Sequence, residues 1–178
     1  DCLFCIHLQR QYSAARELEE FLKSKKDNSA EESHNAKYFK ALKRGSDNEN
    51  RLNDSYMKNK LGQVVVFGDI IQLFHVKSGK YLTIIPDLLA KDERENIRVV
   101  LDANGSSYSW LQIQPRYKID REGDNILSRS EVYLRVAERS NEFIHRADRE
   151  PLPGHDREVN CSLESTSWRL NIFQSSTD

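Results

Sequence analysis

The spacing of apolar residues changes at about position 62, from a helical pattern to the short runs of β-strands. Near the start of the chain, Leu18, Phe21 and Leu22 are spaced i, i+3 and i+4, which places them on one side of a helix. Ser13 stands just before this stripe, where a helix N-cap is favoured. We therefore expect a first helix after an opening strand over residues 1 to about 9.

A second helix is expected after the break at Asp27-Asn28-Ser29. Gly45-Ser46-Asp47 is expected to interrupt it, because glycine costs about 1 kcal/mol in a helix interior. Both helices are highly charged and have narrow apolar stripes, so they should pair as a hairpin or lean on a larger body. The apolar residues of the second helix are Tyr38, Phe39, Leu42, Leu52 and Tyr56.

From Gln63 onward, short β-prone runs alternate with turn residues such as Gly, Asn, Asp and Ser. Many short strands with regular turn signals predict an all-β barrel or sandwich. The runs cover residues 64–67, 70–74, 81–85, 97–101 and 110–113.

An internal repeat of about 55 residues favours the barrel. Each copy reads Gly-Asp, strand, Tyr-Leu, strand, variable loop, strand, and Ser-Trp before a last strand. The matching pairs are Gly68-Asp69 with Gly123-Asp124, Tyr81-Leu82 with Tyr133-Leu134, Ser109-Trp110 with Ser167-Trp168, and 97–100 with 158–161. Copies with about four strands each fit a barrel with threefold pseudosymmetry, because a closed sheet leaves no unpaired edge.

The predicted fold is therefore mainly β: a β-trefoil with its first repeat truncated and an inserted α-helical hairpin arm. Residues 1–9 would end the first repeat, 10–62 would form the helical arm insertion, and 63–178 would hold the second and third repeats. The start at Asp1, without Met, leads us to expect a chain that begins in mid-protein. Trp110 and Trp168 are expected to fill the core, and Tyr81 and Tyr133 are expected to pack with their hydroxyl groups at its rim.

Composition narrows the possible functions. The net charge is −1, with 27 basic and 28 acidic residues, which disfavours nucleic acid as a partner. No apolar run reaches the roughly 18 residues that span a bilayer. Three cysteines, Cys2, Cys5 and Cys161, fit a reduced cytosolic protein. Cys2 and Cys5 form a C-x-x-C, but they read as strand residues rather than as zinc ligands or a redox pair.

No catalytic motif is present in the sequence, so we expect neither an enzyme nor a cofactor or metal. His75 reads as a strand-end residue, and His145 and His155 lie in a charged, proline-containing loop. The basic residues that could bind a polyphosphate are Lys77, Lys80, Arg98, Arg116, Lys118 and Arg121. They are spread over several strands and interleaved with acids, so a solvated surface is the favoured interpretation.

Four segments of the sequence, taken together, carry a resemblance to a known family. They are "GDIIQLFHVKSGKYLTI" (68–84), "IRVVLDANG" (97–105), "SWLQIQPRYKI" (109–119) and "EVNCSLESTSW" (158–168). This set resembles the MIR family and, more narrowly, the N-terminal region of inositol trisphosphate receptors. The resemblance implies a cytosolic coupling domain of a tetrameric calcium-release channel, at the cytosolic face of the endoplasmic reticulum. Such a domain lowers ligand affinity and transmits ligand binding to the gate.

The resemblance also implies partners and a site. The partners would be the neighbouring ligand-binding core and other channel subunits, with cytosolic regulatory proteins possible on the helical arm. The family's coupling tyrosine matches Tyr117 and its neighbour Lys118, on a loop from Arg116 to Asp124 that also carries Arg121. The family has an aromatic residue where this chain has Arg116.

Two alternatives remain open from the sequence. One is a carbohydrate-binding trefoil, although such lectins usually carry Q-x-W triplets and this chain has none. The other is a MIR or trefoil module attached to a lumenal glycosyl-transfer or chaperone system. That module would be expected in a secretory context with disulfides.

Overall fold

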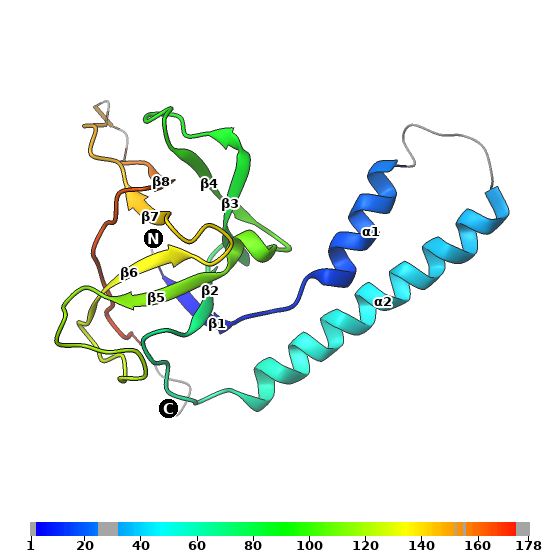
Figure 1. Ribbon diagram of the computed structural model, residues 1–178, viewed down its shortest axis with the longest axis horizontal. Helices are drawn as coiled ribbons and strands as arrows, with labels where there is room; N and C mark the ends of the chain where they lie inside the picture. The colour runs from blue at the N-terminus through cyan, green and yellow to red at the C-terminus, as the bar shows by residue number, and fades with distance from the viewer. Residues whose placement is uncertain (1–2, 25–31, 152, 155, 174–178) are drawn as a thin grey trace. The chain divides into compact units, whose positions relative to one another are not determined.

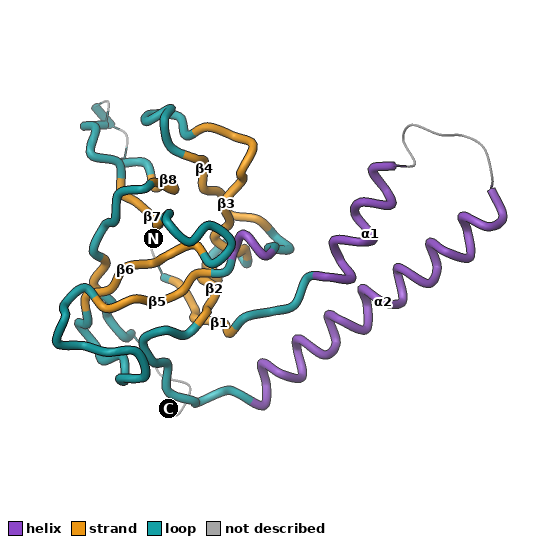
Figure 2. Tube along the Cα trace, in the orientation of Figure 1, coloured by secondary structure: helices purple, strands orange, loops and turns teal. Residues whose placement is uncertain are grey.

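The computed structural model describes residues 3–24, 32–151, 153–154 and 156–173, and it divides the chain into two units. One unit comprises residues 10–61 and the other comprises 1–9 together with 62–178. Figure 2 shows the helices in purple and the strands in orange. The assignment of 1–9, 10–62 and 63–178 to trefoil repeats and an arm stays a prediction.

The helical unit holds α1 (Ser13–Ser24) and α2 (Glu32–Asn59), drawn in blue and cyan in Figure 1. The expected interruption at Gly45-Ser46-Asp47 is wrong, because α2 runs through it without a break. This stretch faces α1: Ser46 is buried, and a Cβ at Gly45 would lie 3.8 Å from that of Ala14. Packing between the helices therefore outweighs the low helix propensity of glycine.

The start of α1 is held by side chains of α2. The Glu49 carboxylate accepts hydrogen bonds from Ser13 Oγ at 2.8 Å and from the backbone N–H of Ala14 and Ala15 at 2.9 and 3.1 Å. Asn53 bonds both the N–H and the C=O of Gln11, each at 2.9 Å. The first N–H groups of a helix lack intrahelical acceptors, so Glu49 supplies the cap that Ser13 was expected to supply alone.

The second unit is an antiparallel sheet that closes on itself, with strand order β1-β2-β3-β4-β8-β7-β6-β5 and a further pairing of β5 with β2. The strands are β1 (Phe4–Leu8), β2 (Ile70–His75), β3 (Lys80–Leu89), β4 (Ile97–Asp102), β5 (Leu111–Pro115), β6 (Glu131–Val136), β7 (Phe143–Arg146), β8 (Val159–Ser162) and β9 (Trp168–Arg169). A short 3₁₀ helix, η1 (Ser107–Ser109), precedes β5. The expected strand at 64–67 is wrong: Val66 forms only an isolated bridge with Asn125.

The two sequence copies have the same strand pairings, but the predicted match of Tyr81-Leu82 with Tyr133-Leu134 is wrong. Tyr81-Leu82 lies on β3, the second strand of its copy, whereas Tyr133-Leu134 lies on β6, the first strand of its copy. In the first copy β2 pairs with β5, and in the second copy β6 pairs with β9. The last strand of the first copy, β5, pairs with the first strand of the second, β6. In the same way β1, which precedes the first copy, pairs with β2, the first strand of that copy. The equivalent strands β4 and β8 of the two copies pair with each other.

The repeated Gly-Asp pairs form equivalent turns. Gly68 has φ +98° and Gly123 has φ +90°, in the left-handed region that favours glycine. In the first turn the Asp69 carboxylate accepts from the N–H three residues earlier at 2.9 Å, and in the second Asp124 does so at 2.8 Å. The predicted strand at 64–67 is lost here, because the N–H groups of Val66 and Phe67 bond to Asp69 and Asp124 rather than to a strand.

The interior of the closed sheet is apolar. Its buried residues include Phe67, Ile71, Ile84, Leu111, Ile113, Val132, Leu134, Val136, Ile144 and Cys161. Trp168 is half-buried against this core and donates its indole N–H to the Ile144 carbonyl at 3.0 Å. Trp110 is also half-buried, so the expectation that both tryptophans fill the core is wrong in degree. Tyr81 is buried, with its hydroxyl 3.1 Å from His7 Nδ1, and Tyr133 is half-buried.

The cysteines occupy different environments. Cys5 is exposed on β1 and Cys161 is buried on β8, and both are free thiols. Cys2 lies outside the described residues, so the C-x-x-C interpretation is not tested by the structure. His155 also lies outside them. Over the described ranges, neither helix combines the length and apolar character that crossing a bilayer requires.

Candidate interaction site

The predicted interaction loop leaves the sheet where the β5–β6 ladder ends. The last bond of that ladder is from Arg116 N–H to the Glu131 carbonyl, at 3.3 Å. At the far end of the loop, Gly123 and Asp124 exchange backbone bonds with Phe67, at 2.8 and 3.0 Å. Because Phe67 belongs to the buried core, the loop projects from a rigid base at both ends.

Tyr117 and Ile119 are the apolar residues of this loop. Tyr117 is 50% exposed and Ile119 is 85% exposed. Both residues belong to one turn, in which the Asp120 N–H donates to the Tyr117 carbonyl at 3.1 Å. Lys118 and Arg121 are exposed, and Arg121 contributes its backbone N–H to the Asp124 turn.

Glu131, the first residue of β6, lies beneath the loop and binds four side chains. Its Oε2 accepts from Arg116 Nη1 at 2.5 Å, Tyr117 OH at 3.1 Å and Ser167 Oγ at 3.3 Å. Its Oε1 accepts from Arg169 Nη2 at 2.8 Å. We call Glu131, Arg116, Tyr117, Ser167 and Arg169 the Glu131 cluster. The bond from Arg169 and then that from Tyr117 lower the pKa of Glu131 to about 2, with a further contribution from the charge of Arg116.

The structure brings only part of the predicted site together. Arg116 and Tyr117 meet at Glu131, and the Arg116 guanidinium carbon lies 5.3 Å from the centroid of the Tyr117 ring. Lys118 and Arg121 share the loop but are no part of the Glu131 cluster. Sequence reasoning missed Glu131, Ser167 and Arg169. No local signal marks them, because Arg169 is 38 positions from Glu131 and reaches it only through the pairing of β9 with β6.

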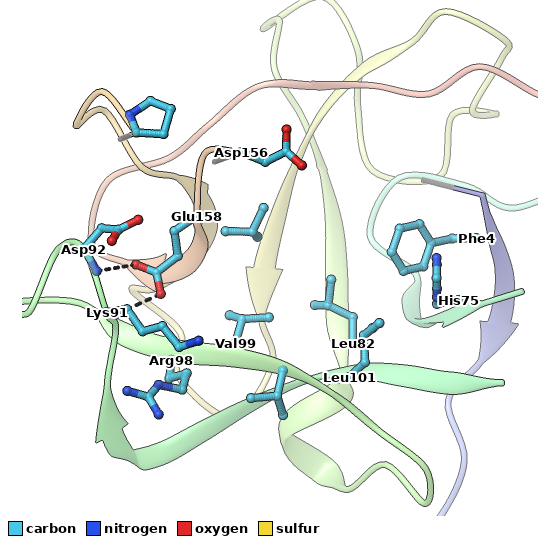
Figure 3. Close-up of a pocket in the computed structure, with 13 residues that line it drawn as sticks. Phe4, His75, Leu82, Lys91, Asp92, Arg98, Val99, Leu101, Asp156 and Glu158 are labelled. Carbon is cyan, nitrogen blue, oxygen red and sulfur yellow. Dashed lines mark hydrogen bonds between the residues drawn. The ribbon is translucent and has the colours of Figure 1, made fainter. Parts of the chain in front are cut away.

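A cavity of about 830 Å³ lies among β1, β4 and β8 (Figure 3). Apolar side chains including Phe4, Leu82 and Val99 line one part of it. The charged lining residues are Lys91, Asp92, Arg98, Asp156 and Glu158. Glu158 is bonded to the backbone N–H groups of Lys91 and Asp92, each at 2.8 Å. Acids outnumber bases in this lining, which does not fit a site for a polyphosphate.

One group among the described residues has the composition of a metal site. Ligand atoms of His145, Asp148 and Glu164 lie within 4.8 Å of one another. The ring of the buried His145 already has protein neighbours, however. Its Nδ1 is 2.9 Å from Thr166 Oγ1, and its Nε2 is 3.8 Å from Glu93 Oε2. Glu93 in turn accepts from Asn160 and from the backbone of Asp148 and Arg149, so these contacts join the 147–149 segment to β8.

Comparison with known proteins identifies the class. A solved structure of a Caenorhabditis elegans protein with unknown function shares the fold, with a TM-score of 0.50 and 18% identity over 62% of each chain. The family model described as "Inositol 1,4,5-trisphosphate/ryanodine receptor" matches residues 1–178. The chain therefore belongs to the inositol 1,4,5-trisphosphate/ryanodine receptor family.

A curated relative gives the comparison more detail. The chain is 31% identical over 181 residues to the inositol 1,4,5-trisphosphate receptor itr-1 of Caenorhabditis elegans. The match covers 97% of this chain and 6% of that receptor, so the chain spans a small part of the length of its relative. These comparisons favour the receptor family over the lectin and lumenal alternatives.

Proposed function

We propose that the chain is a regulatory and coupling domain of an inositol 1,4,5-trisphosphate-gated calcium-release channel. In this role it modulates ligand affinity and transmits ligand binding to the gate. The observation that carries the proposal is the family match over residues 1–178, together with 31% identity to the receptor itr-1. The domain acts at the cytosolic face of the endoplasmic reticulum membrane and performs no reaction of its own.

The contact that transmits the signal is the loop from Arg116 to Asp124. Tyr117 and Ile119 present apolar surface on a loop that is bonded at both ends to the sheet. A half-exposed tyrosine can bury a large area against a partner at low conformational cost. Arg116, Lys118 and Arg121 are matched by three acidic residues of the same loop, so these charges favour a specific docking orientation rather than a partner of one sign of charge. The partner is the neighbouring ligand-binding core or another subunit of the tetramer.

The mechanism is rigid-body coupling between two sites. Ligand binding in the neighbouring core reorients the closed sheet, and the shifted Tyr117 contact biases the gate. A closed antiparallel sheet suits this task because it transmits displacement with little internal deformation. Candidate partners for the helical unit are cytosolic regulatory proteins, since Leu52 and Tyr56 of α2 are 60% and 47% exposed.

The test is Tyr117→Ala in the longer receptor that carries this chain. Loss of the contact should weaken ligand-evoked opening while the ligand still binds. Leu163→Ala is the control, because Leu163 is a 73% exposed apolar residue that lies outside the loop. Single-channel recording with unchanged open probability in Tyr117→Ala would refute the proposed role of the loop.

We further propose that the closed sheet is a β-trefoil in which β1 represents the first repeat. Support comes from the pairings: β2–β5 recurs as β6–β9, and β1–β2 repeats β5–β6. The equivalent strands β4 and β8 pair beside the cavity of Figure 3, where a third equivalent strand would belong. Residues 10–62 are then an arm inserted between the first and second repeats. A structure of a chain extended before Asp1 that left this cavity empty would count against the trefoil.

A further inference from the structure

We infer that Glu131 positions Tyr117 for its partner, by binding the Tyr117 hydroxyl and the Arg116 guanidinium that covers its ring. This inference rests on the proposed function of the Tyr117 loop. It assigns Glu131 an indirect role, in which the residue sets the orientation of another side chain without touching the partner.

The backbone alone does not fix the Tyr117 side chain. The bond from Arg116 N–H to the Glu131 carbonyl is the last of the β5–β6 ladder, and Tyr117 follows it outside the strands. Half of the Tyr117 side chain is exposed, so core packing does not define its rotamer either. Its orientation therefore depends on the contacts of its hydroxyl and of its ring face.

The hydroxyl contact is made to an acceptor that is itself held in place. Besides Tyr117, the Glu131 carboxylate binds Arg116 and Ser167 through Oε2 and Arg169 through Oε1. Glu131 and Arg169 also face each other in the β6–β9 pairing. Hydrogen bonds to an ionised carboxylate are stronger than neutral ones, so this carboxylate offers the hydroxyl a strong and fixed partner.

The ring contact passes through the same residue. The Arg116 guanidinium carbon lies 5.3 Å from the Tyr117 ring centroid, within the range of a cation–π interaction. Arg116 holds this place while its Nη1 is bonded to Glu131 at 2.5 Å. Glu131 thus fixes Tyr117 at two points, directly at the hydroxyl and through Arg116 at the ring.

Glu131 is not available to the partner. Its side chain is 16% exposed, and both carboxylate oxygens already accept bonds within the chain. The surface that a partner meets is the exposed part of Tyr117 and the 85% exposed Ile119. Removing Glu131 should therefore change the presentation of Tyr117 rather than delete a contact with the partner.

The first experiment observes Tyr117 directly in the 178-residue chain labelled with ¹³C-tyrosine. Glu131→Ala should shift the Tyr117 ring resonances toward those of a freely rotating tyrosine, and Glu131→Gln should give an intermediate result. The control is Glu142→Ala, since Glu142 is also 16% exposed and ion-paired, to Arg139 at 2.5 Å. Tyr117 resonances that are identical in wild type and Glu131→Ala would overturn the inference.

A second variant covers the case in which Glu131→Ala fails to fold. Tyr117→Phe removes only the hydroxyl of a half-exposed ring, so the sheet should be preserved. Losing this donor should raise the pKa of the Glu131 carboxyl above its value of about 2, as followed by a ¹³C-carboxyl titration. A Glu131 pKa that is unchanged in Tyr117→Phe would show that the hydroxyl bond is not formed.

The third experiment separates positioning from a purely structural effect. In the longer receptor, Glu131→Ala should reduce ligand-evoked opening about three- to tenfold, the size expected for one or two hydrogen bonds. In a Tyr117→Phe background the same change should cause a clearly smaller loss. Fully additive losses would overturn the positioning role. Unchanged opening in Tyr117→Ala would instead overturn the proposed role of the loop and leave only the intramolecular contact.

Discussion

Asp69 and Asp124 accept the same bond in two neighbouring turns of the closed sheet. Each carboxylate accepts the backbone N–H three residues earlier, from Val66 at 2.9 Å and from Arg121 at 2.8 Å. The two turns are joined directly, because Phe67 N–H donates to the Asp124 carbonyl. The internal repeat of the sequence thus corresponds to a repeated hydrogen-bond arrangement, and the second turn forms the far end of the Tyr117 loop.

Asp124→Ala should loosen that end of the loop. The Arg121 N–H would lose its acceptor, and we expect a loss of about 1 kcal/mol in the free energy of unfolding. Urea denaturation followed by tryptophan fluorescence would measure it. Asp87→Ala is the control, because Asp87 is exposed near the end of β3. Equal stability of the two variants would show that the turn does not depend on the Asp124 carboxylate.

Glu49→Ala should destabilise the helical unit by about 1–2 kcal/mol, since three donors at the start of α1 lose their acceptor. The loss should be seen as an earlier melting of the helical circular dichroism signal. Glu20→Ala provides the comparison, because Glu20 forms only an exposed pair with Arg16 at 3.8 Å. Identical melting curves for Glu20→Ala and Glu49→Ala would contradict the capping role of Glu49.

The Glu49 carboxyl should also make the stability of the helical unit depend on pH. Burial raises the pKa of its carboxyl, but the bonds from Ala14, Ser13 and Ala15 outweigh burial and leave the pKa lowered. A carboxyl with a lowered pKa in the folded state stabilises above its unfolded pKa, and this contribution is lost as the pH falls through the folded pKa. The stability difference between wild type and Glu49→Gln should therefore be constant near neutral pH and shrink below about pH 4.3.

The hydrogen bonds of the Glu131 cluster should persist to a lower pH than those of Glu49. Because its pKa is about 2, held there first by Arg169 and then by Tyr117, Glu131 remains ionised well below the unfolded value of about 4.3. Its stabilising contribution is complete above that unfolded value and disappears only as the pH approaches 2. Titration of the Glu131 carboxyl by NMR would check this. A midpoint near 4 would mean that the four bonds to the carboxylate are weak in solution.

The two described thiols should differ in reactivity. Burial, and then the adjacent Glu142, raise the pKa of the Cys161 thiol, whereas Cys5 is exposed. Since the thiolate is the reactive form, Cys161 should alkylate at least about 100-fold more slowly in the native chain than in denaturant. Peptide mapping after iodoacetamide treatment would measure both sites. Rapid native labelling of Cys161 would indicate that β8 opens readily.

The amino-acid pattern by itself determined most of the strands and helices, and it indicated the repeat apart from the Tyr-Leu match. Short β-prone runs and Gly-Asp turns are local signals, so β2, β3, β4 and β5 lie close to where they were predicted. The resemblance in "SWLQIQPRYKI" indicated Tyr117, whose coupling role stays a prediction. Where local preference and packing disagreed, packing prevailed. The helix α2 continues through Gly45, which approaches Ala14 of α1, and Glu49 of α2 accepts the Ala14 N–H.

Only the tertiary structure decided how the strands close and what holds the loop. The return of β5 to β2 and of β9 to β6 joins segments about 40 residues apart. Those pairings bring Arg169 and Ser167 to the same carboxylate as Arg116 and Tyr117. A single sequence shows each of these residues as an ordinary polar position, because hydrogen bonds between distant segments exist only after the sheet has closed.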